Sequence, residues 1–136
     1  MNQQLIITRG LPGSGKSTWA KAWVLEDPKT RIRVNRDDIR RMLGPYWVPE
    51  REGLVTTLEN LMVKNSLSNS YSVVVDATNF KDYRWDSVAI TNGHRPIIKD
   101  FTDVPVEECI RRDLLRVESV GEEVIMRMYN KYLKNE

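Results

Sequence analysis

The residues from Gly10 to Thr18 restrict the fold of this chain more than any other segment. They read Gly-Leu-Pro-Gly-Ser-Gly-Lys-Ser-Thr and match the pattern G-x-x-x-x-G-K-[ST] of phosphate-binding loops. The glycines let the backbone curl so that several N–H groups point at one oxyanion, and the following helix adds the positive end of its dipole. An apolar run precedes the loop and an amphipathic segment follows it, so the sequence predicts a strand, a phosphate loop and a helix in that order.

Apolar runs and amphipathic segments alternate along the rest of the chain, which predicts an α/β fold with a parallel sheet. The predicted strands cover residues 5–9, 32–35, 72–76 and 96–101, although residues 32–35 could equally be an irregular connection. The predicted helices cover residues 16–25, 38–43, 49–69, 82–92, 105–117 and 122–133. In the long middle helix, the face expected to pack on the sheet consists of Leu54, Leu58, Leu61, Met62 and Asn65.

Composition excludes several kinds of site. The chain has one cysteine, Cys109, and one histidine, His94, so neither a disulfide framework nor a cysteine-based zinc site can form within it. Any catalysis is therefore expected to depend on carboxylates, lysine, arginine and backbone dipoles. No Asn-Lys-x-Asp element of the GTPase type is present.

Charge and hydropathy restrict the partners and the compartment. The formal net charge of +2 gives no general electrostatic reason to wrap nucleic acid, so any such contact must be local. No apolar run is long enough for a signal peptide or a membrane span, and we therefore expect a cytoplasmic protein without a membrane partner.

Two acidic positions follow predicted strands, at the edge of the sheet where ligands bind in such folds. Asp76 ends the third strand and could hold Mg²⁺ together with Ser17, or could simply cap a helix. Asp37 follows the second strand and could accept a proton from a substrate hydroxyl, or could belong to a solvated, charge-rich loop. Arg40 lies on the same side of the next helical turn, where it could bind an acceptor phosphate or neutralise its neighbours.

Two further pairs leave alternatives open. Arg112 and Arg116 share one helix face and could contact transferring phosphates as part of a lid, but Glu108 is placed to pair with Arg112 in an ordinary exposed ion pair. Tyr46 and Trp47 could stack on a nucleobase or could be buried core residues.

Taken together, five motifs occur in a specific order along nearly the whole chain. They are G-L-P-G-S-G-K-S-T-W, N-R-D-D-x-x-R, D-x-T-N, D-V-P followed by two arginines, and M-Y. In this order they resemble the 5′-kinase domain of bacteriophage T4-type polynucleotide kinases. The resemblance implies a single P-loop kinase domain over residues 1–136, with three α/β/α layers, four or five parallel strands and a helical lid at about residues 105–121.

The resemblance also implies an activity and a set of site residues. The implied activity is transfer of the ATP γ-phosphate to 5′-hydroxyl ends of DNA or RNA in end repair, with Mg²⁺ as cofactor and a location in the host cytoplasm if a phage encodes the chain. The implied catalytic residues are Lys16, Asp37 and Arg116. The implied ATP-binding residues are Gly10, Pro12, Gly13, Ser14, Gly15, Lys16, Ser17, Thr18, Arg112 and Arg116. The implied acceptor contacts are Asp37, Arg40, Thr78 and Asn79, and the implied metal ligands are Ser17 and Asp76.

Other functions remain in competition. The 136 residues contain no D-x-D-x-[TV] motif, so 3′-phosphatase activity is not expected of them. Small P-loop kinases of the gluconate, shikimate, antibiotic or sugar-nucleotide type use a similar loop, an early acidic base and lid arginines, and differ in the acceptor. A nucleotide-binding regulatory protein without useful turnover is a third possibility, which the combination of a candidate base and lid arginines disfavours.

Overall fold

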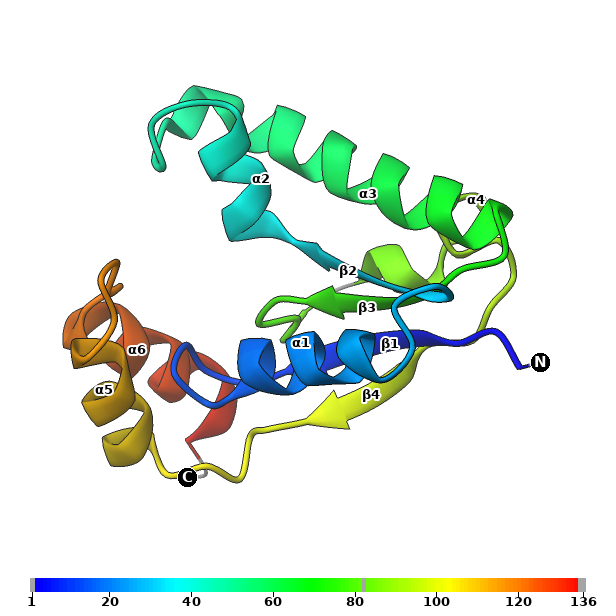
Figure 1. The fold of residues 1–136 in the computed structure, drawn as a ribbon. Coiled ribbons are helices and arrows are strands. Elements are labelled where there is room, and N and C mark those ends of the chain that lie inside the picture. The colour runs from blue at the N-terminus through cyan, green and yellow to red at the C-terminus, as the bar shows by residue number, and fades with distance from the viewer. Residues whose placement is uncertain (1, 82, 135–136) are drawn as a thin grey trace.

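The computed structural model describes residues 2–81 and 83–134, and a parallel sheet lies at their centre (Figure 1). Four strands in the order β2-β3-β1-β4 form this sheet within the described residues. The strands are β1 (Leu5–Arg9), β2 (Arg31–Asn35), β3 (Ser72–Asp76) and β4 (Ile97–Asp100). All four predicted strands are confirmed to within one residue at each end, and the segment before Asn35 is a true strand because it pairs with β3 from Arg31 to Asn35.

Helices cover both faces of the sheet, which gives the three-layer arrangement that the motifs implied (Figure 1). The helices are α1 (Lys16–Glu26), α2 (Arg36–Met42), α3 (Glu52–Ser68), α4 (Val88–Thr91), α5 (Val106–Leu114) and α6 (Glu122–Met128). Alternate strand residues point to opposite faces. Ile6 and Val74 pack with Ala20 and Trp23 of α1. The other face packs against α3.

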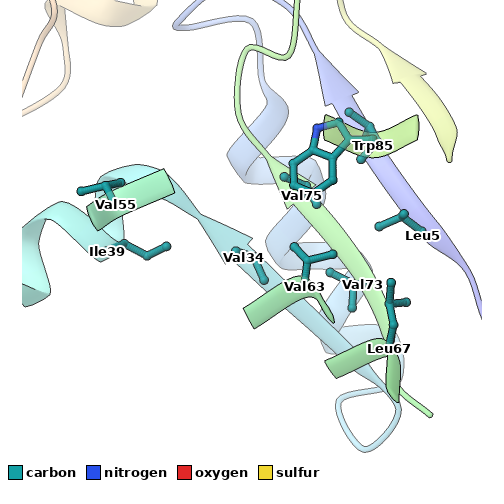
Figure 2. Close-up of a cluster of buried hydrophobic side chains, with 10 residues drawn as sticks. Leu5, Val34, Ile39, Val55, Val63, Leu67, Val73, Val75 and Trp85 are labelled. Carbon is teal, nitrogen blue, oxygen red and sulfur yellow. The ribbon is translucent and has the colours of Figure 1, made fainter. Parts of the chain in front are cut away.

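The core under α3 is the larger of the two (Figure 2). It contains Leu5, Ile7, Val34, Ile39, Val55, Val63, Leu67, Val73, Val75 and Trp85. Strands buried on both faces are continuous apolar runs, and Val73–Val75 of β3 are fully buried as expected. This packing fixes the carboxyl ends of β1, β2 and β3 at one edge of the sheet, where the phosphate loop and α2 begin.

The predicted buried face of α3 is wrong. The structure instead buries Val55, Glu59, Val63 and Leu67, which are spaced four residues apart. Leu54 and Leu61 are 48% and 47% exposed, and only Leu58 of the predicted set packs against the core. This buried row includes the carboxylate of Glu59, which a search for apolar residues at helical spacing does not find. Its Oε1 accepts hydrogen bonds from Arg36 at 2.8 Å and Arg84 at 2.6 Å, and this pairing lets an acidic side chain be fully buried.

Several helix boundaries also differ from the predictions. The 49–69 segment begins as a 3₁₀ turn, Pro49–Arg51, before α3. The 82–92 segment is a 3₁₀ turn, Tyr83–Asp86, followed by α4, and residue 82 lies outside the described residues. α2 begins two residues earlier than expected, and the final segment ends as a π-helical turn, Tyr129–Leu133.

The helix predicted to reach residue 117 ends at Leu114, because the next loop folds back onto it. The buried carboxylate of Asp113 accepts the N–H groups of Val120 and Gly121, both at 3.0 Å. None of the described helices has the length and apolar character needed to span a membrane.

Candidate active site

The phosphate loop needs glycine at two positions for steric reasons. A Cβ on Gly10 would lie 2.7 Å from the Ser14 Oγ and 2.9 Å from the Phe101 Cβ. Gly13 has a φ of +83°, and a Cβ there would collide with the backbone carbonyl of Cys109 in α5. The loop is therefore packed directly against the backbone of the lid helix.

Lys16 opens α1 and lies inside this loop, with 8% of its surface exposed. Its Nζ donates hydrogen bonds to the carbonyl of Gly10 at 2.9 Å and to that of Leu11 at 2.6 Å. Burial lowers the pKa of Lys16 to about 8, and the nearby Asp76 carboxylate offsets part of that effect. The ammonium group is thus held at the helix N-terminus, where anionic phosphates are favoured.

Ser17 and Asp76 are close together, as the sequence predicted. The Ser17 Oγ donates to the Asp76 Oδ2 at 2.7 Å, and Arg33 Nε donates to the same oxygen at 2.8 Å. A hydroxyl and a carboxylate are oxygen donors that suit Mg²⁺. No group of three or more His, Cys, Asp or Glu side chains able to hold a metal occurs among the described residues.

Arg33 is a site residue that sequence reasoning missed. It bridges Asp76 to Asp38, whose Oδ2 accepts from its Nη1 at 2.7 Å. A charged residue within a predicted buried strand, two positions before Asn35, was the signal that could have revealed it.

The start of α2 is tied to the end of β3, and this contact positions Asp37. The Asn35 side chain accepts from the Asp38 N–H at 2.9 Å and donates to the Asp76 carbonyl at 2.9 Å. Such a cap satisfies a free N–H of the first helical turn and fixes where the helix begins. The Asp37 carboxylate then lies at the same sheet edge as Asp76 and the phosphate loop.

Asp37 has two donors on one of its oxygens. Its Oδ1 accepts from Arg40 Nη1 at 2.6 Å and from the Tyr46 hydroxyl at 2.7 Å. None of the hydrogen bonds among the described residues ends on Oδ2. Burial, and then the bond to Asp37, raises the pKa of Tyr46 to about 12, so Tyr46 stays a donor near neutral pH. The carboxylate is therefore oriented through one oxygen and keeps the other for a ligand.

Arg40 is held by two carboxylates. Besides Asp37, Glu52 at the start of α3 accepts from its Nε at 3.0 Å and from its Nη2 at 2.6 Å. These hydrogen bonds raise the pKa of Arg40 and lower that of Glu52. Glu52 was missed because it lies twelve residues from Arg40, and no local pattern links the two. An acceptor phosphate at Arg40 would share the guanidinium with Glu52.

Arg112 lies on the lid helix α5, but Arg116 follows the end of that helix at Leu114, so the predicted shared helix face is wrong. Both arginines still line the space above the phosphate loop. Arg112 pairs with Glu108 at 2.8 Å, as the spacing predicted, and its Nη1 lies 3.4 Å from the carbonyl of Gly13. Arg116 lies 3.5 Å from the Asp113 carboxylate. Arg111 and Arg112 together lower the pKa of Glu108 to about 2. The predicted ion pair between Arg112 and Glu108 is confirmed, and Arg112 nevertheless lies beside the phosphate loop.

These parts surround one cleft of about 1060 Å³. The predicted residues that line it are Pro12, Gly13, Gly15, Lys16, Ser17, Thr18, Asp37, Arg40, Asp76, Thr78, Arg112 and Arg116. Gly10 and Ser14 belong to the same loop but are buried, and they are not among the lining residues. Such a cleft, with an anion-binding loop facing a carboxylate and arginines, can bring a phosphoryl group and a hydroxyl group together.

The structure does not bring the Asn79 side chain into this cleft. Asn79 is 4% exposed, and its amide donates to the carbonyls of Thr8 at 2.8 Å and Val75 at 3.2 Å, while its oxygen accepts from Trp85. The side chain thereby links β1 to β3. This buried, fully bonded position is at odds with the predicted acceptor contact of Asn79.

Comparisons with known proteins identify several relatives of this chain. A protein-family model, AAA_33, described as an AAA domain, matches residues 5–134. The L-seryl-tRNA(Sec) kinase of Methanococcus maripaludis is 32% identical over 94% of this chain. A protein of Autographa californica nuclear polyhedrosis virus, provisionally named a bifunctional polynucleotide kinase/RNA ligase, is 28% identical over 98% of it. The chain spans 52% of the first relative and 21% of the second.

Solved structures with similar folds include a chain of the Pnkp1/Rnl/Hen1 RNA repair complex. It is 32% identical, has a TM-score of 0.77, and the match covers 96% of this chain and 44% of that one. A gluconokinase from Sinorhizobium meliloti 1021 has a TM-score of 0.58 at 16% identity, covering 97% of this chain and 75% of that one, and at this identity the likeness shows the fold alone.

Proposed function

The chain belongs to the AAA_33 family and is a P-loop kinase, and from this premise we propose that it transfers the γ-phosphate of ATP to the 5′-hydroxyl end of DNA or RNA. The observation that carries the proposal is the Asp37–Arg40 pair on α2, which lines the same cleft as Lys16 and the lid arginines. The 32% identity to a chain of an RNA repair complex and the viral relative with a polynucleotide kinase name support the choice of acceptor.

In the proposed reaction, each part of the cleft has one task. The N–H groups of the loop and Lys16 hold the β- and γ-phosphates, and Arg112 and Arg116 neutralise the charge that spreads over the transferring group. Asp37 Oδ2 accepts the proton of the 5′-hydroxyl while the oxygen of that hydroxyl forms a bond to the γ-phosphorus. The bond from that phosphorus to the β–γ bridging oxygen breaks, and ADP leaves. Arg40 and Tyr46 keep the carboxylate oriented through Oδ1.

Mg²⁺ is the cofactor that fits this site. Ser17 and Asp76 would hold it, and when bound it supplies positive charge to the phosphate oxygens. Arg33, from the neighbouring strand β2, also donates to the Asp76 carboxylate and helps to hold it in place.

A second candidate acceptor is a serine hydroxyl on an aminoacyl-tRNA, which the 32% identity to a seryl-tRNA kinase favours. The two acceptors present different hydroxyl groups to the same base. A small-molecule kinase and a regulatory nucleotide-binding protein are further alternatives, and the same assay separates all four.

The test is an ATP-consumption assay with a panel of acceptors. The panel contains DNA and RNA oligonucleotides with a 5′-hydroxyl, the same oligonucleotides with a 5′-phosphate, seryl-tRNA and gluconate. We expect ADP formation that depends on a 5′-hydroxyl oligonucleotide and disappears with the 5′-phosphate form. Turnover with seryl-tRNA or gluconate alone would contradict the proposal, and acceptor-independent binding of ATP without turnover would indicate a regulatory protein.

A further inference from the structure

One large aromatic side chain near the cleft is mostly exposed to solvent. Trp47 does not line the cleft itself, but its ring contacts Arg40, which does. Trp47 lies in the segment between α2 and α3 and is 59% exposed, which is unusual for a residue that buries a large apolar area when it packs. The sequence left open whether it is a core residue, and this exposure excludes that role.

The segment is held in place without the Trp47 ring. Arg51 donates from its side chain to the Leu43 carbonyl and from its backbone N–H to the Val48 carbonyl. Hydrogen bonds among the described residues do not involve the Trp47 indole. The exposed part of the ring is available to a ligand.

The ring lies one side chain away from the candidate base. The Arg40 guanidinium is 5.7 Å from the centre of the Trp47 ring, and the same guanidinium binds Asp37 Oδ1 at 2.6 Å. Arg40 covers one face of the indole, and the exposure of the residue leaves surface for a second stacking partner. Tyr46, the neighbouring aromatic, is instead occupied by its hydrogen bond to Asp37.

We propose that Trp47 is a stacking site for the base of the acceptor's terminal nucleotide. This inference rests on the proposed function, because it takes the 5′-hydroxyl of that nucleotide to lie at Asp37. The base is attached to the sugar that carries this hydroxyl, so it falls within reach of a side chain next to Arg40. Stacking accepts any base because every base has a flat π-face, and Arg40 beside the ring suits the charged backbone. An acyclic polyol or an amino acid offers no such face.

The experiment combines variants with two acceptors. One acceptor is an oligonucleotide with a 5′-hydroxyl, and the other is the same oligonucleotide with an abasic 5′-terminal residue. For wild type, removal of the base is expected to raise the acceptor KM by about 5- to 150-fold, the range for loss of one stacked base. Trp47→Ala is expected to raise KM for the complete oligonucleotide by a similar factor and to remove the difference between the two acceptors.

Two controls accompany this comparison. Trp47→Phe keeps a stacking ring and should restore most of the preference for the complete acceptor. Tyr83→Ala removes another aromatic side chain, 78% exposed, which lies in the 3₁₀ turn before α4, and should leave both KM values unchanged. The KM for ATP should be the same in all variants, which shows that the phosphate loop is intact.

The outcomes distinguish failure of the stacking site from failure of the proposed kinase function. Suppose that wild type phosphorylates the oligonucleotide. If Trp47→Ala then has the wild-type KM, or if its KM rises by the same factor for both acceptors, the stacking site is refuted while the proposed function stands. If wild type phosphorylates neither oligonucleotide, the proposed function fails and the stacking site fails with it.

Discussion

The two oxygens of the Asp37 carboxylate have different surroundings, and this difference defines its proposed role. Oδ1 is bound by Arg40 and Tyr46, which leaves Oδ2 to accept a proton. Asp37→Asn preserves the size of the side chain but removes the base. We expect kcat to fall by about 10²- to 10⁴-fold, the usual contribution of a general base, with an unchanged KM for ATP. Steady-state kinetics with saturating acceptor measures both constants, and a variant that lost ATP binding but kept its kcat would show that Asp37 is not the base.

The lowered pKa of Lys16 predicts how ATP affinity depends on pH. In the free protein Lys16 is charged below about pH 8 and becomes neutral above it. Bound phosphates favour the charged form, so above that pH binding must take up a proton, and the Kd for ATP should rise by up to about tenfold per pH unit. Calorimetry from about pH 7 to about pH 9.5 in two buffers of different ionisation enthalpy would detect the uptake. Lys16→Met should bind weakly without this dependence, and a constant wild-type affinity over the range would be inconsistent with the lowered pKa.

At the scale of single residues, the sequence predicts the chemistry but not the supporting contacts. Lys16, Ser17, Asp76 and Asp37 follow from a motif or from the end of a strand, because parallel strands bring such positions to one edge. The contacts of Glu52 with Arg40 and of Tyr46 with Asp37 could not be predicted, because each joins side chains that are nine or more residues apart and meet only in the folded chain.

At the scale of elements, the phosphate loop and the lid helix act as one packed unit. The Gly13 position has a positive φ and no room for a Cβ against the α5 backbone. Gly13→Ala should therefore destabilise the fold by about 1–3 kcal/mol and raise the KM for ATP, since either the loop or α5 must move. Thermal unfolding and ATP kinetics measure the two effects.

Gly53 in α3 provides the matched control, because a Cβ there would have no atom within 4 Å and the residue is helical. Gly53→Ala should leave ATP binding unchanged and stabilise the protein by roughly 0.5–1 kcal/mol. Equal thermal stabilities for the two variants would argue against a tightly packed loop and lid.

The elements differ in how well the sequence predicts them. The strands are predicted closely, since runs such as Val73–Val75 are buried on both faces and stay apolar throughout. α3 is predicted with the wrong face, because Glu59 is buried by pairing with arginines from α2 and from the turn before α4. Hydrophobic periodicity cannot register a buried carboxylate whose partners come from other elements.

At the scale of the whole molecule, the near-neutral charge predicts shallow contact with nucleic acid. The net charge is +2, and the arginines on the acceptor side of the cleft are paired with carboxylates. We expect contact with roughly one or two acceptor phosphates, so log(1/KM) for a single strand should fall with log salt with a slope of about −1. The KM should also stop improving once the acceptor is a few nucleotides long. A slope several times steeper would mean that the chain binds an extended stretch of backbone.

The central claim is that this P-loop kinase phosphorylates a 5′-hydroxyl end. The most direct measurement supplies ATP labelled at the γ-phosphate and a 5′-hydroxyl oligonucleotide, then digests the product to nucleotides. We predict label in the 5′-monophosphate of the first nucleotide, and none when the oligonucleotide already carries a 5′-phosphate or when Asp37→Asn replaces wild type at equal time. An unlabelled oligonucleotide, recovered while the same preparation phosphorylates seryl-tRNA, would contradict the account.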